Sequence, residues 1–310
     1  MSLEILRFNY PEGMLRFCDL MRSADPVWIG RNGGSDTDFV ELWDGENFSH
    51  PSVIKMRKLN GYFDKEASTQ KLEAFREMYL RSSSFMDLCT VHMSSRFGAS
   101  LEGHTQSTKT LKEKYGLRAI MCWRFIENAT YFMESFRTWG CGKRILVVSP
   151  FSSSIEYQIQ PSKLPNLHKE DYGFSEASFS TLNTPVTYNG EGWVSEAVEE
   201  GDWFQVADRI FEDLKRRDFD IVWLSCGSYA MYLGEKVKRE LGKKSIYLGG
   251  LANVFFNIYN FRYSSTGHDL AVVNPRTQIE SFENSLFNTP DKTSKFPFSE
   301  GLRAYFGERS

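Results

Sequence analysis

A glycine-rich turn that carries both positive and negative charge spans residues 31–38 (RNGGSDTD). Glycine lets the backbone approach a ligand closely, and the free amides at the start of a following helix favour an anion. Arg31 is suited to pair with a phosphate group. Asp36 and Asp38, one residue apart, supply carboxylate oxygens that a divalent cation prefers, and such a cation in turn binds phosphate oxygens. This turn predicts a phosphate site that could include a metal ion.

A structural alternative exists for the same residues. Ser35 as a helix N-cap with Asp38 three residues later resembles a capping box. Acidic residues are also favoured in the first turn of any helix. From spacing alone this alternative is favoured over the phosphate site.

A second candidate turn, Ser149-Pro150-Phe151-Ser152, follows the strongly apolar run 144–149. That run predicts a buried strand. The hydroxyls and amides of Ser149, Phe151 and Ser152 could bind a phosphate or a sugar. The alternative is a loop with a helix N-cap.

The most regular part of the chain, residues 218–250, contains two tight turns. An apolar run at 221–224 predicts a strand, apolar residues at helical spacing predict a helix over 229–241, and a second apolar run predicts a strand over 245–248. A strand–helix–strand unit of this length implies parallel pairing, and ligands of such sheets bind at the carboxyl ends of the strands. Those ends carry the two small-residue turns, Cys226-Gly227-Ser228 and Gly249-Gly250. No base lies near Cys226 in the sequence, so a buried thiol is favoured over a nucleophile.

The remaining elements extend the same pattern. Strands are expected at 27–30, 88–93 and 144–149, and helices at 11–21, 36–43 and 203–216, whereas 161–192 is expected to be irregular. The sequence therefore predicts an α/β, Rossmann-like, mostly parallel sheet with helices on both faces. We expect one α/β domain over residues 1–310, with 264–310 as a tail that wraps the surface.

Composition excludes several classes of protein. The net charge of −3 and the lack of a basic stripe argue against nucleic-acid binding. No GxGxxG, GxxxxGK[ST], GxSxG or HExxH motif is present, and the five histidines are scattered. The five cysteines are scattered too, which indicates reduced thiols in a reducing compartment, and we expect a cytoplasmic protein. No apolar run approaches the roughly 18 residues of a membrane span.

Several blocks of the sequence resemble the GT-D type glycosyltransferases and poorly characterised bacterial and viral proteins related to them. The resemblance covers the start of the chain and most of residues 144–263, through SPFSSSIEYQ, the block CGSY…GKK…LGG and IGRNGGSDTDF. It implies transfer of a sugar from a nucleotide sugar, expected to be a UDP-sugar, to a glycan acceptor during polysaccharide biosynthesis. It also implies a divalent cation, Mn²⁺ or Mg²⁺.

Site residues follow from the turns and the resemblance together. The expected metal ligands and catalytic residues are Asp36 and Asp38, with Asp38 as the nominated general base. The expected nucleotide-binding residues are Arg31, Gly33, Gly34, Ser35, Ser149, Phe151, Ser152, Cys226, Gly227, Ser228, Gly249, Gly250 and Asn253. Aromatic residues within 251–263 are expected to form a wall for the acceptor.

This chain departs from the family pattern at its acidic motif. The usual first acid falls on Gly34 and the usual glutamate on Asp36, so a surviving metal site would be Asp36 with Asp38, shifted in register. Two alternatives therefore stay open: another polysaccharide-modifying transferase on the same fold, and a non-catalytic module that binds a nucleotide or a glycan. The oligomeric state and the choice between inverting and retaining transfer are also open.

Overall fold

One parallel sheet organises the molecule, in a computed structural model that describes residues 4–6, 10–64, 68–91, 112–122, 129–185, 187, 201–259 and 274–283. Its eight described strands lie in the order β1-β4-β3-β2-β8-β7-β5-β6, and every pairing is parallel. The strands are β1 (Glu4–Leu6), β2 (Trp28–Asn32), β3 (Leu88–Val91), β4 (Ala119–Cys122), β5 (Arg144–Ser149), β6 (Ser178–Asn183), β7 (Ile221–Leu224) and β8 (Lys244–Tyr247). The predicted α/β, Rossmann-like fold is confirmed.

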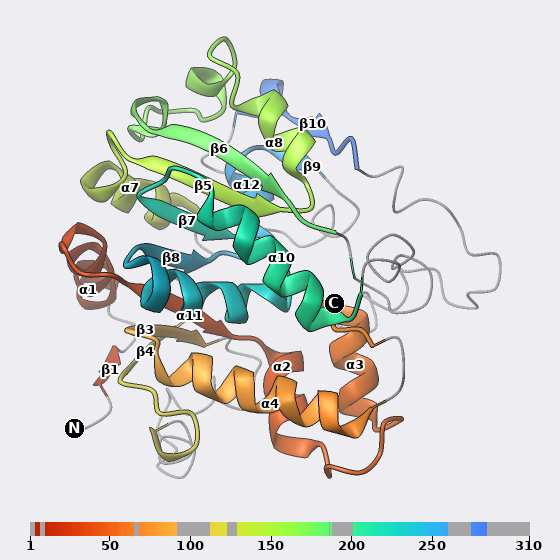
Figure 1. Ribbon diagram of the computed structural model, residues 1–310. Helices are drawn as coiled ribbons and strands as arrows, with labels where there is room; N and C mark the ends of the chain where they lie inside the picture. The colour runs from red at the N-terminus through yellow and green to blue at the C-terminus, as the bar shows by residue number, and fades with distance from the viewer. Residues whose placement is uncertain are drawn as a thin grey trace, which may run out of the picture.

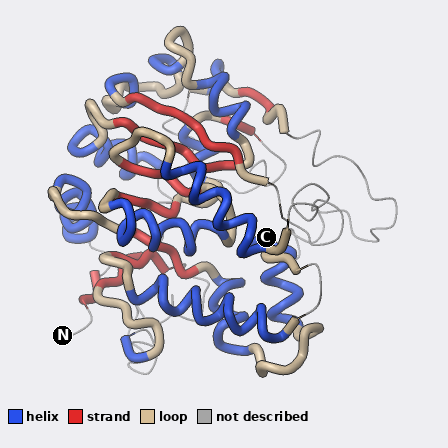
Figure 2. Tube along the Cα trace, in the orientation of Figure 1, coloured by secondary structure: helices blue, strands red, loops and turns tan. Residues whose placement is uncertain are grey.

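Helices cover both faces of this sheet (Figures 1 and 2). One hydrophobic cluster joins the sheet to α2 (Gly34–Leu42), α3 (Pro51–Asn60), α4 (Thr69–Ser84), α10 (Trp203–Lys215) and α11 (Tyr229–Leu241). A second cluster joins the opposite face to α1 (Tyr10–Arg22), α7 (Ala129–Trp139), α8 (Ser152–Gln158) and α12 (Leu251–Phe255). The core is therefore divided by the sheet into two layers.

Two predicted boundaries differ from the structure. The strand expected at 27–30 runs on to Asn32, and the helix expected from Asp36 begins at Gly34, so only Gly33 separates β2 from α2. The stretch 161–192, expected to be irregular, contains the edge strand β6. β6 was missed because it alternates serine and threonine with apolar residues and lies among proline, asparagine and glycine.

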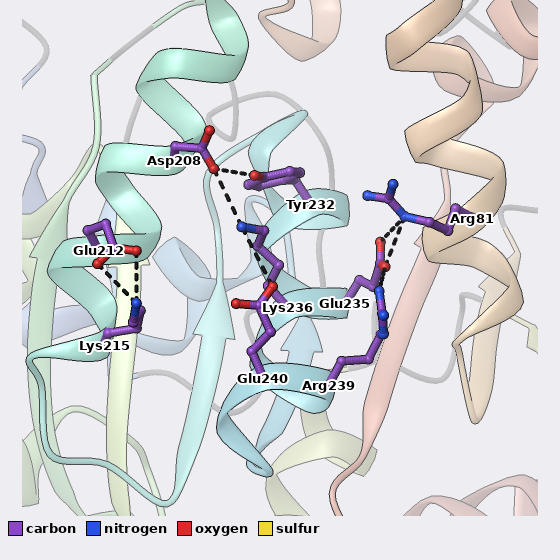
Figure 3. Close-up of polar contacts among 9 residues, drawn as sticks. All are labelled: Arg81, Asp208, Glu212, Lys215, Tyr232, Glu235, Lys236, Arg239 and Glu240. Carbon is purple, nitrogen blue, oxygen red and sulfur yellow. Dashed lines mark hydrogen bonds and ion pairs between the residues drawn. The ribbon is translucent and has the colours of Figure 1, made fainter.

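The helix α11 is held by polar contacts on both sides, as Figure 3 shows. The buried carboxylate of Glu235 accepts hydrogen bonds from Nε of Arg81 on α4, at 3.0 and 3.1 Å, and from Nη1 of Arg239, at 2.7 Å. On the other side, the Tyr232 hydroxyl donates to Asp208 on α10. Glu235 is almost fully buried, although a glutamate at this position of the helix is of a type that is usually solvated. These contacts fix the helix and, with it, the turn before its first residue.

A small second sheet joins β9 (Ile258–Tyr259) to β10 (Ile279–Glu280) in parallel. Only β10 lies in the segment 274–283, the described part of the expected C-terminal tail. Gln158 of α8 donates through Nε2 to the carbonyl of Thr277, at 2.9 Å. The division of the chain into one domain and a wrapping tail stays a prediction.

Candidate functional site

The two halves of the sheet meet where β2 lies beside β8. The chain leaves β2 into α2, whose Phe39 and Val40 pack on one face of the sheet. It leaves β8 into α12, whose Leu251 and Ala252 pack on the other face. Adjacent parallel strands whose following helices go to opposite faces form a topological switch point, the place where open α/β sheets bind ligands.

The ends of β2 and β8 touch each other at this point. A Cβ added to Gly249 would lie 2.8 Å from Nη1 of Arg31, and Gly249 has a φ of +58°. A Cβ added to Gly33 would lie 3.2 Å from Oδ2 of Asp36 and 3.9 Å from Nε of Arg31. The structure thus brings Arg31, Gly33, Asp36 and Gly249 together, as the sequence led us to expect for these turns.

Asp36 is a buried carboxyl group, with 3% of its surface exposed. Burial raises its pKa from 3.8 to about 6, and this effect is opposed by a hydrogen bond from the Asn60 amide and by the charge of Arg31. An acid with this pKa is protonated in part of the molecules near pH 6. Its charge therefore changes close to neutral pH.

Asp38 lies apart from Asp36. Residues i and i+2 of a helix do not face each other, and Asp38 pairs with Nζ of Lys55 on α3 at 2.6 Å. The structure therefore does not place the carboxylates of Asp36 and Asp38 where both could bind one metal ion. Within the described residues, no group of three or more His, Cys, Asp and Glu is placed to hold a metal ion.

The first turn of α2 presents backbone amides toward the same edge of the sheet. Gly33 is the N-cap and has no side chain to cap the helix, so the amides of Gly34, Ser35 and Asp36 have no acceptor inside the helix. The capping-box alternative is wrong, because Ser35 lies inside the first turn and donates through Oγ to Oδ1 of Asn60, at 2.9 Å.

The turn between β7 and α11 adjoins this group. The Ser225 hydroxyl donates to the carbonyl of Gly249 at 2.6 Å, which ties the ends of β7 and β8 together. Gly227 has a φ of +60°, and the Ser228 hydroxyl accepts a hydrogen bond from Nε1 of Trp203 at 2.8 Å. Burial raises the pKa of the Cys226 thiol far above its usual value, so this residue is a buried thiol, as favoured from the sequence.

The turn after β5 is engaged within the protein. Oγ of Ser149 accepts from the amide of Phe151 at 3.1 Å, and Oγ of Ser152 donates to Asn183 at 3.1 Å. The amide of Ser154 donates to the buried carboxylate of Glu283 at 3.1 Å. Since β7 and β8 separate β5 from β2, the structure does not bring Ser149, Phe151 and Ser152 to Arg31.

The segment after Gly249 contains two expected nucleotide-binding residues, Gly250 and Asn253, and part of the expected acceptor wall. Gly250 is the N-cap of α12, and Asn253 is fully buried with neither side-chain amide atom hydrogen-bonded. Phe255 and Phe256, expected in an acceptor wall, are instead fully buried core residues. The rest of the expected wall, residues 260–263, lies outside the described residues.

Asn60 was not found from the sequence. It follows no strand, and its contacts with Asp36 and Ser35 reach across 24 and 25 residues. Its one local signal is its place directly before Gly61, which ends α3 in the left-handed conformation with a φ of +80°.

Comparisons with known proteins give distant structural likenesses. One solved structure, described as the highly conserved domain of unknown function 1792 with a distinct glycosyltransferase fold, is 15% identical, with 80% of this chain and 78% of that chain covered and a TM-score of 0.44. A selenomethionine-substituted structure of the same domain is 13% identical, with 81% and 79% covered and a TM-score of 0.46. The description agrees with the resemblance drawn from the sequence.

No protein-family description matches the chain, and no curated protein matches it. In the part of the chain that the structure describes, every helix is too short or too polar to cross a bilayer.

Proposed function

We propose that this protein is a glycosyltransferase that uses a nucleotide-sugar donor, a UDP-sugar, and that the donor's diphosphate binds at the ends of β2 and β8. The observation that carries the proposal is the meeting of Arg31, the amide-bearing first turn of α2 and Gly249 at the switch point of a parallel sheet. The acceptor proposed is a glycan.

The chemistry of this site suits the departure of a diphosphate. In the transfer, the bond between the anomeric carbon and the diphosphate oxygen breaks, and the electron pair leaves with the diphosphate. A hydroxyl oxygen of the acceptor forms the new bond to the anomeric carbon, and its proton passes to solvent water. The guanidinium of Arg31 and the amides of α2 offset the charge that grows on the leaving group. Gly33 and Gly249 lack the Cβ atoms that would crowd Asp36 and Arg31.

Among the described residues, Asp36 offers a carboxylate for a divalent cation at this site. Mg²⁺ is bound in many proteins by one or two carboxylates together with substrate phosphates. Asp36 supplies one such carboxylate beside Arg31, whereas Asp38 is occupied by Lys55. A cation would neutralise Asp36 and the diphosphate together, and we propose that Asp36 is its single ligand from these two acids.

Calorimetric titration with UDP, with and without Mn²⁺, tests the proposal. We expect wild-type binding to be stronger with Mn²⁺, Arg31→Ala to weaken it at least tenfold, and Asp36→Ala to remove the dependence on Mn²⁺. The matched controls are Arg216→Ala and Asp213→Ala, an exposed pair at the end of α10, which should bind as the wild type does.

Three outcomes separate the alternatives. Absence of UDP binding by the wild type contradicts the proposal. Loss of Mn²⁺ dependence in Asp38→Ala would instead support the metal site formed by Asp36 and Asp38 together, as expected from the sequence. Binding without any turnover of a panel of nucleotide sugars would support a non-catalytic binding module.

The proposed compartment is the cytoplasm. Cys18, Cys89, Cys141 and Cys226 are free thiols. Free thiols persist in reducing compartments, which supports this part of the proposal.

A further inference from the structure

Asn60, the last residue of α3, contacts three residues: two on α2 and one at the start of α11. Its Nδ2 donates to Oδ1 of Asp36, and its Oδ1 accepts from Oγ of Ser35 at 2.9 Å. Its main-chain carbonyl accepts from the amide of Ser228 at 2.8 Å. The amide orientation follows from chemistry, because an ionised carboxylate only accepts hydrogen bonds and must face the NH₂ group, whereas a hydroxyl can donate to the amide oxygen.

The position of Asn60 is fixed by the residue that follows it. Gly61 adopts a φ of +80°, and its amide donates to the carbonyl of Arg57 at 3.3 Å. A Cβ added to Gly61 would lie 2.3 Å from Oγ1 of Thr187 and 3.0 Å from its backbone. The end of α3 therefore has little freedom to move away from Asp36.

Through these contacts Asn60 links the ends of β2 and β7 across the intervening β8. On the β2 side it holds the first turn of α2 by both Ser35 and Asp36. On the β7 side it holds Ser228, whose hydroxyl accepts from Trp203, and the Trp203 ring stacks on Tyr229 at 5.2 Å and 9°. The same residue thus connects two of the turns that surround the proposed diphosphate site.

We propose that Asn60 is a positioning residue of the donor site: its side-chain amide holds the Asp36 carboxylate in the orientation that faces Gly33 and Arg31. A buried carboxylate without a hydrogen-bond donor is unfavourable. We therefore expect the Asp36 carboxylate to rotate toward another partner, or the first turn of α2 to shift, when the Asn60 amide is removed. The inference rests on the proposed function for its effect on binding, and on the hydrogen bonds alone for its effect on Asp36.

The test uses Asn60→Ala, which removes both side-chain contacts and leaves the carbonyl bond to Ser228 intact. We expect UDP to bind at least tenfold more weakly in the presence of Mn²⁺. Asn166→Ala is the matched control, because Asn166 is exposed and its side chain donates to the carbonyl of the nearby Ser162. The control should bind UDP as the wild type does.

A double-variant comparison separates positioning from general support of the fold. In the Asp36→Ala background, Asn60→Ala should weaken UDP binding less than threefold, because the carboxylate that the Asn60 amide positions is absent from both proteins. An equal loss in both backgrounds would show a structural role and overturn the inference.

Crystal structures of the wild type and Asn60→Ala complete the test without any ligand. We expect the Asp36 carboxylate to leave its orientation toward Gly33 in the variant. An unchanged carboxylate overturns the inference whether or not UDP binds. Failure of the wild type to bind UDP contradicts the proposed function, and the two crystal structures then decide the role of Asn60 separately.

Discussion

At the scale of single residues, Asp36 is a carboxyl group whose ionised form is destabilised by its burial. Its carboxylate is buried beside two compensating groups, the Asn60 amide and the Arg31 guanidinium. A group left under-compensated in this way is expected at a functional site, where a ligand or cation completes the arrangement. Asn253 shows the same feature in a neutral form, since its buried amide has no partner.

The pH dependence of stability should reveal Asp36 directly. Its pKa is raised from 3.8 to about 6 on folding, so the folded protein binds this proton more tightly than the unfolded chain does. The contribution of Asp36 is therefore most favourable below about pH 4 and is lost as the pH rises to 6; a shift of this size corresponds to about 3 kcal/mol at most.

Urea unfolding of the wild type and Asp36→Asn at pH 4.5, 6 and 8 measures this effect. We expect Asp36→Asn to be the more stable protein at pH 8 and the difference to shrink toward pH 4.5. Asp64, whose pKa is also raised to about 6, titrates in both proteins and cancels in the comparison. A difference that stays constant with pH would contradict the burial of a charged Asp36.

At the scale of elements, prediction from sequence succeeded where periodicity was strong. The unit β7–α11–β8 was predicted because α11 repeats apolar residues at helical spacing and ends at Gly242, which has a φ of +62°. The sequence does not predict the edge strand β6, because β6 has no continuous apolar run. It does not predict the role of Asn60 either, because Asn60 contacts residues that are 24 and 25 positions away in the sequence. Asp36 was found by its type, but sequence could not show that Asp38 faces Lys55 instead.

The attachment of α11 to α4 gives a prediction at this scale. Removing both arginines, Arg81→Ala with Arg239→Ala, leaves the carboxylate of Glu235 buried without its partners. A buried acceptor left without its donors costs about 1–3 kcal/mol, and because both arginines are half-exposed we expect the free energy of unfolding to fall by an amount in this range.

The control for this prediction is an exposed pair in Figure 3, Lys215 and Glu212 on α10, with 2.9 Å between Nζ and Oε1. Lys215→Ala should cost less than about 1 kcal/mol, as exposed ion pairs do. Both are measured by urea unfolding at pH 7. A double arginine variant as stable as Lys215→Ala would show that α11 is held by its apolar face alone.

At the scale of the whole molecule, the meeting of the two half-sheets is what makes a site. β2 and β8 belong to halves that are distant in sequence, and residues 28–29 pair with residues 245–246. Neither half supplies the site alone, because Arg31 comes from one and Gly249 from the other. The sequence indicated this meeting only through the general rule for parallel sheets, and the structure adds the contact itself.

Gly249→Ala tests that contact, with Gly242→Ala as its matched control. Both glycines have a positive φ, +58° and +62°, so either alanine should cost about 1–2 kcal/mol of stability. A Cβ at Gly242 meets nothing within 4 Å, whereas a Cβ at Gly249 would lie 2.8 Å from Nη1 of Arg31 and must displace the guanidinium. We therefore expect similar losses of stability in urea unfolding, but weaker UDP binding in calorimetry only for Gly249→Ala. Equal UDP affinity in the two variants would mean that the junction of β2 and β8 does not bind the diphosphate.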